Sequence, residues 1–102
     1  MIRRQVVVAA AARDDLLAIY DHVLRNTSQA TALAYVERIE AWLATFDVAS
    51  ERGTRRDDLR PSLRTIGFER RVTAAFVVSG ERVVILRLFY AGQDWGAALR
   101  DG

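Results

Sequence analysis

The stretch Gly53-Thr-Arg-Arg-Asp-Asp-Leu-Arg-Pro-Ser-Leu-Arg64 separates two halves of the chain that have different hydrophobic patterns. Before it, apolar residues recur three and four positions apart, as in amphipathic helices, and after it they come in runs typical of strands. Pro61, the only proline, cannot donate to a sheet ladder and stands just before the first of these runs. The stretch is therefore predicted to be a loop between a helical half and a strand-rich half.

Two helices are predicted before this loop. The apolar stripe of the first consists of Ala12, Leu16, Ile19, Tyr20 and Val23, and that of the second of Ala32, Tyr35, Ile39, Trp42, Leu43 and Phe46. Asn26-Thr-Ser28 interrupts the pattern, and Ser28 is a suitable N-cap for the second helix, which is expected to run to about Ala49. Asp14 and Asp15 are expected in the first turns of the first helix, where carboxylates favour the helix dipole. A short polar break between two helices predicts an antiparallel hairpin.

Strands are predicted on both sides of the hairpin. The first covers residues 2–9, with a β-branched run at Val6-Val-Val8, and is expected to join a sheet built from the second half. The other three are predicted at 63–69, 72–79 and 82–90, the last two joined by a turn at Gly80. A short helix is expected around 94–100. The predicted fold is α+β: an N-terminal strand, a two-helix antiparallel hairpin, then a three-stranded antiparallel sheet.

Composition limits the classes of protein that the chain can represent. Its 102 residues, 51% of them hydrophobic, predict a single domain over residues 1–102. The absence of cysteine excludes disulfides and thiolate metal sites. The N-terminus superficially resembles a signal peptide, but Arg13, Asp14 and Asp15 follow its short apolar run at once, so we expect a cytoplasmic protein with no membrane partner. Adjacent aspartates without a third ligand are weak metal sites, and neither a metal nor a cofactor is expected.

Charge is segregated along the chain. Residues 52–71 hold seven arginines against three acidic residues, whereas residues 10–51 hold three arginines against seven. The chain has no lysine, and arginine presents a rigid donor fork to carboxylates and phosphates. Arg87 stands in an apolar strand, so its side chain is expected to reach the surface on the same face as the loop. The predicted basic face, for an acidic protein or a nucleic acid, consists of Arg55, Arg56, Arg60, Arg64, Arg87 and Tyr90.

Three stretches carry a family resemblance: 12–20, the arginine-rich loop 53–64, and Val84-Ile-Leu-Arg-Leu-Phe-Tyr-Ala-Gly-Gln-Asp-Trp95. Over essentially its whole length the chain resembles ParE-type toxins of the RelE/ParE superfamily, the toxin half of bacterial type II toxin-antitoxin modules. The resemblance implies an inhibitor of DNA gyrase that traps cleaved DNA. It also implies neutralisation by a ParD-like antitoxin in a hetero-oligomeric complex, with plasmid stabilisation as a typical role.

The other branch of the superfamily cuts messenger RNA on the ribosome with arginine, lysine, histidine and tyrosine side chains. This chain lacks lysine, and it has Tyr90-Ala-Gly-Gln-Asp94 where many relatives have His-Gly-Arg-Arg-Asp. Its one histidine, His22, lies far along the chain from Tyr90 and is expected to be a surface residue without a motif partner. We therefore expect an inhibitor that acts by binding, with no catalytic residues. A ribosome-dependent mRNA endonuclease and a homologue without toxicity are the alternatives.

The resemblance also implies a binding site for the antitoxin. ParD-like antitoxins resemble amphipathic helices that fill an apolar groove. The candidate groove residues, part of which we expect to be open without the antitoxin, are Leu16, Tyr20, Tyr35 and Trp42. On the basic face, replacing Arg64 or Arg87 with alanine is expected to weaken toxicity without unfolding the protein.

Overall fold

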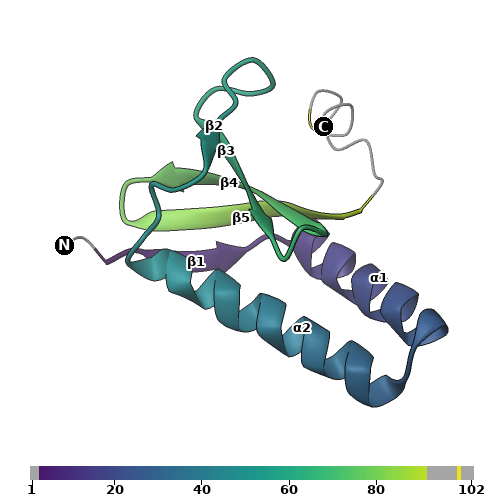
Figure 1. Cartoon of the computed structure of the whole chain (residues 1–102). Coiled ribbons are helices and arrows are strands. Elements are labelled where there is room, and N and C mark those ends of the chain that lie inside the picture. Colours follow the sequence, from purple (N-terminus) through teal and green to yellow (C-terminus); the bar gives the residue numbers. More distant parts are fainter. Residues whose placement is uncertain (1–2, 92–98, 100–102) are drawn as a thin grey trace.

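A helical hairpin packs against one face of a five-stranded sheet in the computed structural model, which describes residues 3–91 and 99 (Figure 1). The elements are β1 (Gln5–Val8), α1 (Ala10–Asn26), α2 (Gln29–Ala44), the 3-10 turn η1 (Thr45–Asp47), β2 (Thr54–Arg55), β3 (Leu63–Phe68), β4 (Val72–Ser79) and β5 (Arg82–Tyr90). The predicted α+β class and element order are confirmed. The helix expected around 94–100 falls outside the described residues, apart from Leu99.

The strand order of the sheet is β1-β5-β4-β3-β2. β3, β4 and β5 form the predicted antiparallel unit, and β1 joins it parallel to β5, with Val8 opposite Ile85. Within the arginine-rich loop, Thr54 and Arg55 form β2, an edge strand antiparallel to β3 that the sequence did not predict. Two exposed polar residues carry no alternation that could mark a strand.

The helix ends show where local signals were correct and where they were not. Ser28 caps α2, since its hydroxyl accepts a hydrogen bond from the backbone N–H of Thr31 at 3.2 Å, as predicted. The dipole role expected for the two aspartates is wrong, because α1 begins at Ala10 and its first turn has no acidic residue. The predicted end near Ala49 is also wrong, because α2 ends five residues earlier and the chain tightens into η1.

Arg52 closes the end of this helical segment. Its guanidinium donates to the carbonyl oxygens of Ala49 and of Thr45, the latter at 2.9 Å, and lies 4.3 Å from the centre of the Phe46 ring. Carbonyl groups at a helix end lack partners within the helix, so a side-chain donor stabilises this end. One arginine of the basic segment is thus structural.

The core lies between the hairpin and the sheet. Most residues of the predicted stripes are buried in it: Ala12, Ile19, Val23, Ala32, Tyr35, Ile39 and Leu43, with Phe46 of η1. The other stripe residues, Leu16, Tyr20 and Trp42, are partly buried and pack against this core. A second, smaller cluster lies on the opposite face of the sheet and contains Leu63, Ala75, Phe89 and Leu99, with Leu59 of the arginine-rich loop against it. Across residues 3–91 and 99, no helix is long and apolar enough to cross a membrane.

Candidate functional site

The arginine-rich loop is anchored to the sheet at its first residue. Gly53 has φ +76°, and a Cβ atom there would lie 2.3 Å from the carbonyl oxygen of Thr65, so the site accepts only glycine without a shift of the backbone. The next two residues pair with β3, which sets Arg55 opposite Arg64. Like charges directly opposite each other are unfavourable, so this pairing needs a nearby carboxylate.

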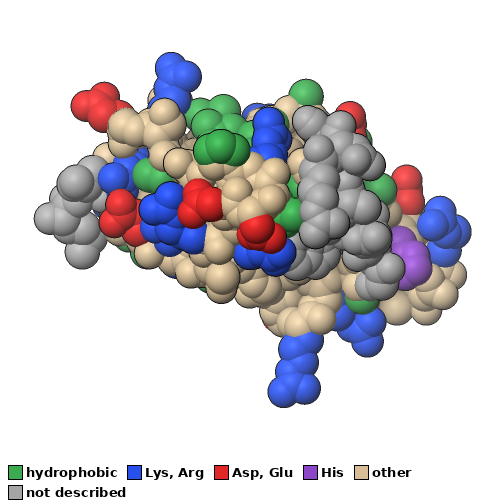
Figure 2. Space-filling view, turned by 90° about the horizontal axis from the view of Figure 1, so that it is seen from above, with side chains coloured by type: hydrophobic (Ala, Val, Ile, Leu, Met, Phe, Trp, Pro, Cys, Tyr) green, Lys and Arg blue, Asp and Glu red, His purple; other side chains and the backbone are tan. Residues whose placement is uncertain are grey.

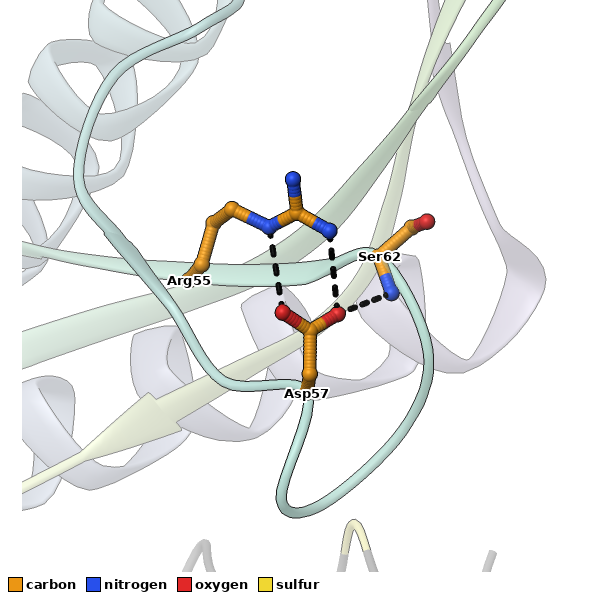
Figure 3. A network of polar contacts seen from close by, with 3 residues as sticks. All are labelled: Arg55, Asp57 and Ser62. Atoms are coloured by element: carbon orange, nitrogen blue, oxygen red, sulfur yellow. Dashed lines mark hydrogen bonds and ion pairs between the residues drawn. The ribbon is translucent and has the colours of Figure 1, made fainter.

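Asp57 provides that carboxylate (Figure 3). Arg55 Nε and Nη2 donate to its two oxygens at 3.1 Å each, and the backbone N–H of Ser62 donates to Oδ1 at 2.8 Å. These hydrogen bonds, first that from Arg55 and then that from Ser62, lower the pKa of Asp57 below its ordinary 3.8. Asp58 binds Arg56 in the same bidentate way, at 2.9 Å for both bonds. The two aspartates neutralise the two loop arginines, as the sequence indicated.

The remaining loop arginines are less compensated. Arg60 is exposed, and Arg64 is half-buried with one hydrogen bond, from Nη1 to the carbonyl oxygen of Arg52 at 3.4 Å. In the part of the chain that the structure describes, neither makes an ion pair. Arg64 lies opposite Phe76, a member of the helix-side core, so strand alternation directs it to the helix side of the sheet.

The predicted single basic face is therefore divided, which corrects the sequence interpretation. Arg55 pairs with Arg64 and lies on the same side of the sheet, whereas Arg56 lies beyond the end of β2 and is bound to Asp58. Viewed from the face opposite the helices, basic and acidic side chains are intermixed and form no continuous basic patch (Figure 2). The loop presents separate arginines at the sheet edge, and aspartates neutralise Arg55 and Arg56.

Arg87 lies near the other edge of the sheet and is part of the framework. Its Nε and Nη2 donate to the carboxylate of Asp15 in α1 at 2.8 and 3.0 Å, and the same carboxylate accepts the backbone N–H of Leu88 at 2.9 Å. The hydrogen bonds that Arg87 donates to Asp15 raise the pKa of Arg87. In register Arg87 stands opposite Ala75, on the same face as Leu59 of the loop, but its guanidinium is bound to α1. Replacing Arg87 with alanine would therefore destabilise the protein, so it does not test the basic face alone.

Tyr90 and His22 are neighbours, although the sequence interpretation gave His22 no partner. Their ring centres are 5.0 Å apart, and the ring of Tyr35 lies 6.3 Å from that of Tyr90. His22 is exposed, as expected, and together with Asp15 and Arg25 it lines a hollow of about 280 Å³ beside Tyr90. The pairing of β1 with β5 brings α1 alongside the end of β5. His22 and Tyr90 are 68 residues apart in the sequence, so no local pattern could predict that they are neighbours.

The four candidate groove residues do not line one groove. Leu16 lines an apolar hollow of about 250 Å³ with residues of β1 and of the end of α2. Tyr20 is half-buried against the core, and Trp42 stacks on Phe68 with ring centres 4.7 Å apart. Tyr35 is 8% exposed. α1 and α2 expose other large apolar residues, which were not selected from the sequence. The exposed fractions are 65% for Leu17, 36% for Leu24 and 50% for Leu33.

The described residues contain no group of three or more histidine or acidic side chains that could hold a metal ion. The two hollows beside Tyr90 and the exposed leucines are described surfaces that suit binding to other macromolecules.

Comparisons with known proteins agree with one another. A family described as the ParE toxin of the type II toxin-antitoxin system parDE matches residues 6–95. A chain of a chromosomal ParDE toxin-antitoxin system from P. aeruginosa superposes with a TM-score of 0.76 at 29% sequence identity, covering 86% of this chain and 96% of that one. A chain of the toxin-antitoxin complex RelBE2 from Mycobacterium tuberculosis superposes with a TM-score of 0.52 at 18% identity, covering 87% and 99%, which shows a shared fold. No curated protein matches the chain.

Proposed function

The chain belongs to the ParE toxin family of type II toxin-antitoxin systems, and from this premise we propose that it inhibits DNA gyrase and is neutralised by a ParD-like antitoxin. The observation that carries the proposal is the family match over residues 6–95, with the fold likeness to a ParDE system at 29% identity. The proposed action is stoichiometric binding in the cytoplasm.

The antitoxin contact is proposed on the outer side of the helical hairpin. Leu17, Leu24 and Leu33 are exposed there, and Leu16 lines an apolar hollow at the end of the hairpin near β1. A helix with an apolar face would remove these leucines from water, at roughly 25 cal/mol for each Å² buried. This replaces the groove inferred from the sequence, since Tyr35 and Trp42 already pack within the protein.

The target contact is proposed at the arginine-rich loop. Arg60 and Arg64 are the loop arginines that make no ion pair with any described residue, so their guanidinium groups are available to an acidic protein surface or to DNA phosphates. Arg55 and Arg56 contribute less, because bidentate aspartates already neutralise them.

One observation favours a second candidate, a ribosome-dependent mRNA endonuclease. Cleavage without a metal needs a group that takes the proton of a ribose hydroxyl, and the imidazole of His22 stands 5.0 Å from the Tyr90 ring. This candidate ranks second because the nearest strand arginine, Arg87, is bound to Asp15 and is not directed at a substrate.

Induced expression in a bacterial host separates these functions. The proposal predicts DNA damage, cleaved chromosomal DNA held by gyrase, and rescue when an antitoxin gene adjacent to the toxin gene is expressed with it. Rapid translation arrest with cut transcripts would support the endonuclease instead, and unimpaired growth would show that toxicity is absent. A gyrase variant resistant to ParE toxins provides the control, because it should restore growth only in the first case.

A further inference from the structure

A polar hollow of about 260 Å³ lies at the end of the sheet away from the arginine-rich loop. It is bounded by α1, α2, the turn between β3 and β4, and the end of β5. Its lining residues are Val23, Thr31, Tyr35, Arg38, Glu69, Arg71 and Tyr90. The arginine-rich loop precedes β3 and this turn follows it, so the six residues of the strand separate the two sites by about 20 Å.

The hydroxyl of Tyr35 is the first sign that this hollow takes a ligand. The side chain is 8% exposed, its hydroxyl oxygen is buried, and that oxygen makes no hydrogen bond with any described residue. Buried polar atoms are nearly always hydrogen-bonded, because an unsatisfied one loses its interaction with water and gains nothing. A tyrosine hydroxyl is protonated at neutral pH and can donate, and burial, followed by the nearby Tyr90 and Glu69, raises the pKa of Tyr35 further.

The second sign is the turn that places Arg71 at the hollow. Glu69 and Arg70 have φ values of +49° and +65°, and the N–H of Arg71 donates to the carbonyl oxygen of Phe68 at 3.2 Å. Two such turn positions are normally filled by asparagine and glycine, so a glutamate and an arginine here cost stability. Backbone strain of this kind is found preferentially at functional sites.

An ion pair holds the turn in place. Arg38 of α2 binds both carboxylate oxygens of Glu69, at 3.0 and 3.1 Å, which compensates the one acidic side chain of the hollow. Arg71 is exposed and makes no ion pair within the described part of the chain, so it supplies an uncompensated positive charge beside the Tyr35 hydroxyl. A tyrosine O–H and a guanidinium from residues that line one hollow are donors suited to a phosphate group.

Aromatic rings continue from this hollow into the next. Tyr90 lines both this hollow and the one that contains His22 and Arg25. Arginines interleaved with aromatic rings are the pattern of proteins that bind single-stranded nucleic acid, where rings stack on bases and guanidinium groups contact phosphates. An acidic peptide would use the arginines but would gain little from the rings.

We propose that the Tyr35–Arg71 hollow and the adjoining His22–Arg25 hollow form a binding site for single-stranded nucleic acid. One phosphate accepts hydrogen bonds from Tyr35 and Arg71, and a neighbouring base packs beside Tyr90. The site is separate from the arginine-rich loop and does not depend on gyrase being the target.

The test measures binding of the full chain to a fluorescein-labelled six-nucleotide oligouridine by fluorescence anisotropy at several salt concentrations. Tyr35→Phe removes only the buried hydroxyl, and we expect it to raise Kd at least about tenfold, as loss of one hydrogen bond to a charged group does. Arg71→Ala is expected to raise Kd about tenfold and to lower the slope of log Kd against log salt by about one. The matched control is Arg82→Ala, which removes the same charge at the other end of β5 and should change Kd less than about twofold.

Thermal unfolding distinguishes a binding role from a structural one. The Tm of Tyr35→Phe should equal or exceed that of the parent, because the hydroxyl has no partner among the described residues to lose. A lowered Tm would mean that the hydroxyl serves the fold, and the proposal would fail.

Competitors identify the ligand. Unlabelled oligouridine should displace the probe at lower concentration than uridine monophosphate or inorganic phosphate does. Equal displacement by the mononucleotide would refute a strand as ligand, and displacement by an acidic peptide of equal charge but not by the oligonucleotide would assign the site to a protein. Absence of probe binding, or unchanged binding by both variants, would overturn the proposal.

Discussion

The ion pair between Asp15 and Arg87 should contribute more to stability than any other single polar contact described above. β1 covers the edge of β5 only as far as Ile85, so the N–H of Leu88 would face no strand partner. The Asp15 carboxylate accepts that N–H at 2.9 Å and also accepts both donors of Arg87. It therefore joins the second turn of α1 to the uncovered part of β5.

Replacing Asp15 with alanine removes all three hydrogen bonds. The backbone bond to a charged acceptor is worth about 1.5 to 3 kcal/mol. The pair with Arg87 adds less than the 3 to 5 kcal/mol typical of breaking a fully buried pair, because the two side chains are 15% and 35% exposed. We expect a loss of about 2 to 4 kcal/mol in the free energy of unfolding. For a domain of this size that lowers Tm by about 10 to 25 °C.

Urea unfolding followed by circular dichroism measures this loss, and Asp14→Ala is the matched control. Asp14 is the exposed neighbour of Asp15, and its replacement should cost less than about 0.5 kcal/mol. A double-mutant cycle with Arg87→Ala should give a coupling energy of about 1 to 2 kcal/mol. If Asp15→Ala costs no more than Asp14→Ala, or if the two changes are additive, the assignment of this pair to the framework is wrong.

Three further predictions concern the turn, the loop anchor and the loop arginines. The hydrogen bond from Arg38 lowers the pKa of Glu69 below 4.5, so the Glu69 carboxylate stabilises the fold above pH 4.5 and loses this contribution as the pH falls through its folded-state pKa. The difference in unfolding free energy between wild type and Glu69→Gln, measured from pH 7 to pH 3, should therefore shrink as the pH falls. A constant difference would contradict this. Gly53→Ala should lower the free energy of unfolding by at least about 2 kcal/mol and expose the Arg56 amide to hydrogen exchange. The control Gly80→Ala, where φ is also positive but no atom lies within 4 Å of the added Cβ, should lower it by about 1 kcal/mol. Equal losses would show that the contact with β3 is unimportant. Arg60→Ala and Arg64→Ala should each lower toxicity without changing Tm. Arg55→Ala removes a charge that Asp57 already neutralises, so it should lower toxicity less. If the Arg64→Ala variant is folded and fully toxic, the loop does not contact the target.

Local patterns in the sequence were sufficient for most of the fold. The bounds of β4 and β5 agree with the predicted ones, and the Ser28 cap was correct, because alternation, turn residues and capping all act within a few residues. The neutralisation of the loop arginines by Asp57 and Asp58 was also predictable, since partners two residues apart need only a tight loop.

What the sequence could not show depends on contacts between distant segments. The direction of Arg64 follows from its register with β4, and the proximity of His22 to Tyr90 follows from the parallel pairing of β1 with β5. The binding hollow at Tyr35 was missed because a tyrosine in an apolar stripe indicates core, and only the structure shows that its hydroxyl has no described partner.

A DNA gyrase assay with the purified chain tests the central claim most directly. Supercoiled plasmid, gyrase, ATP and the protein are incubated, and the reaction is stopped with detergent and protease. Inhibition of gyrase predicts linear plasmid that increases with toxin concentration and disappears when a ParD-like antitoxin is added in equimolar amount. Unchanged supercoiling with no cleaved DNA, under conditions in which the same preparation arrests growth in cells, would contradict gyrase as the target.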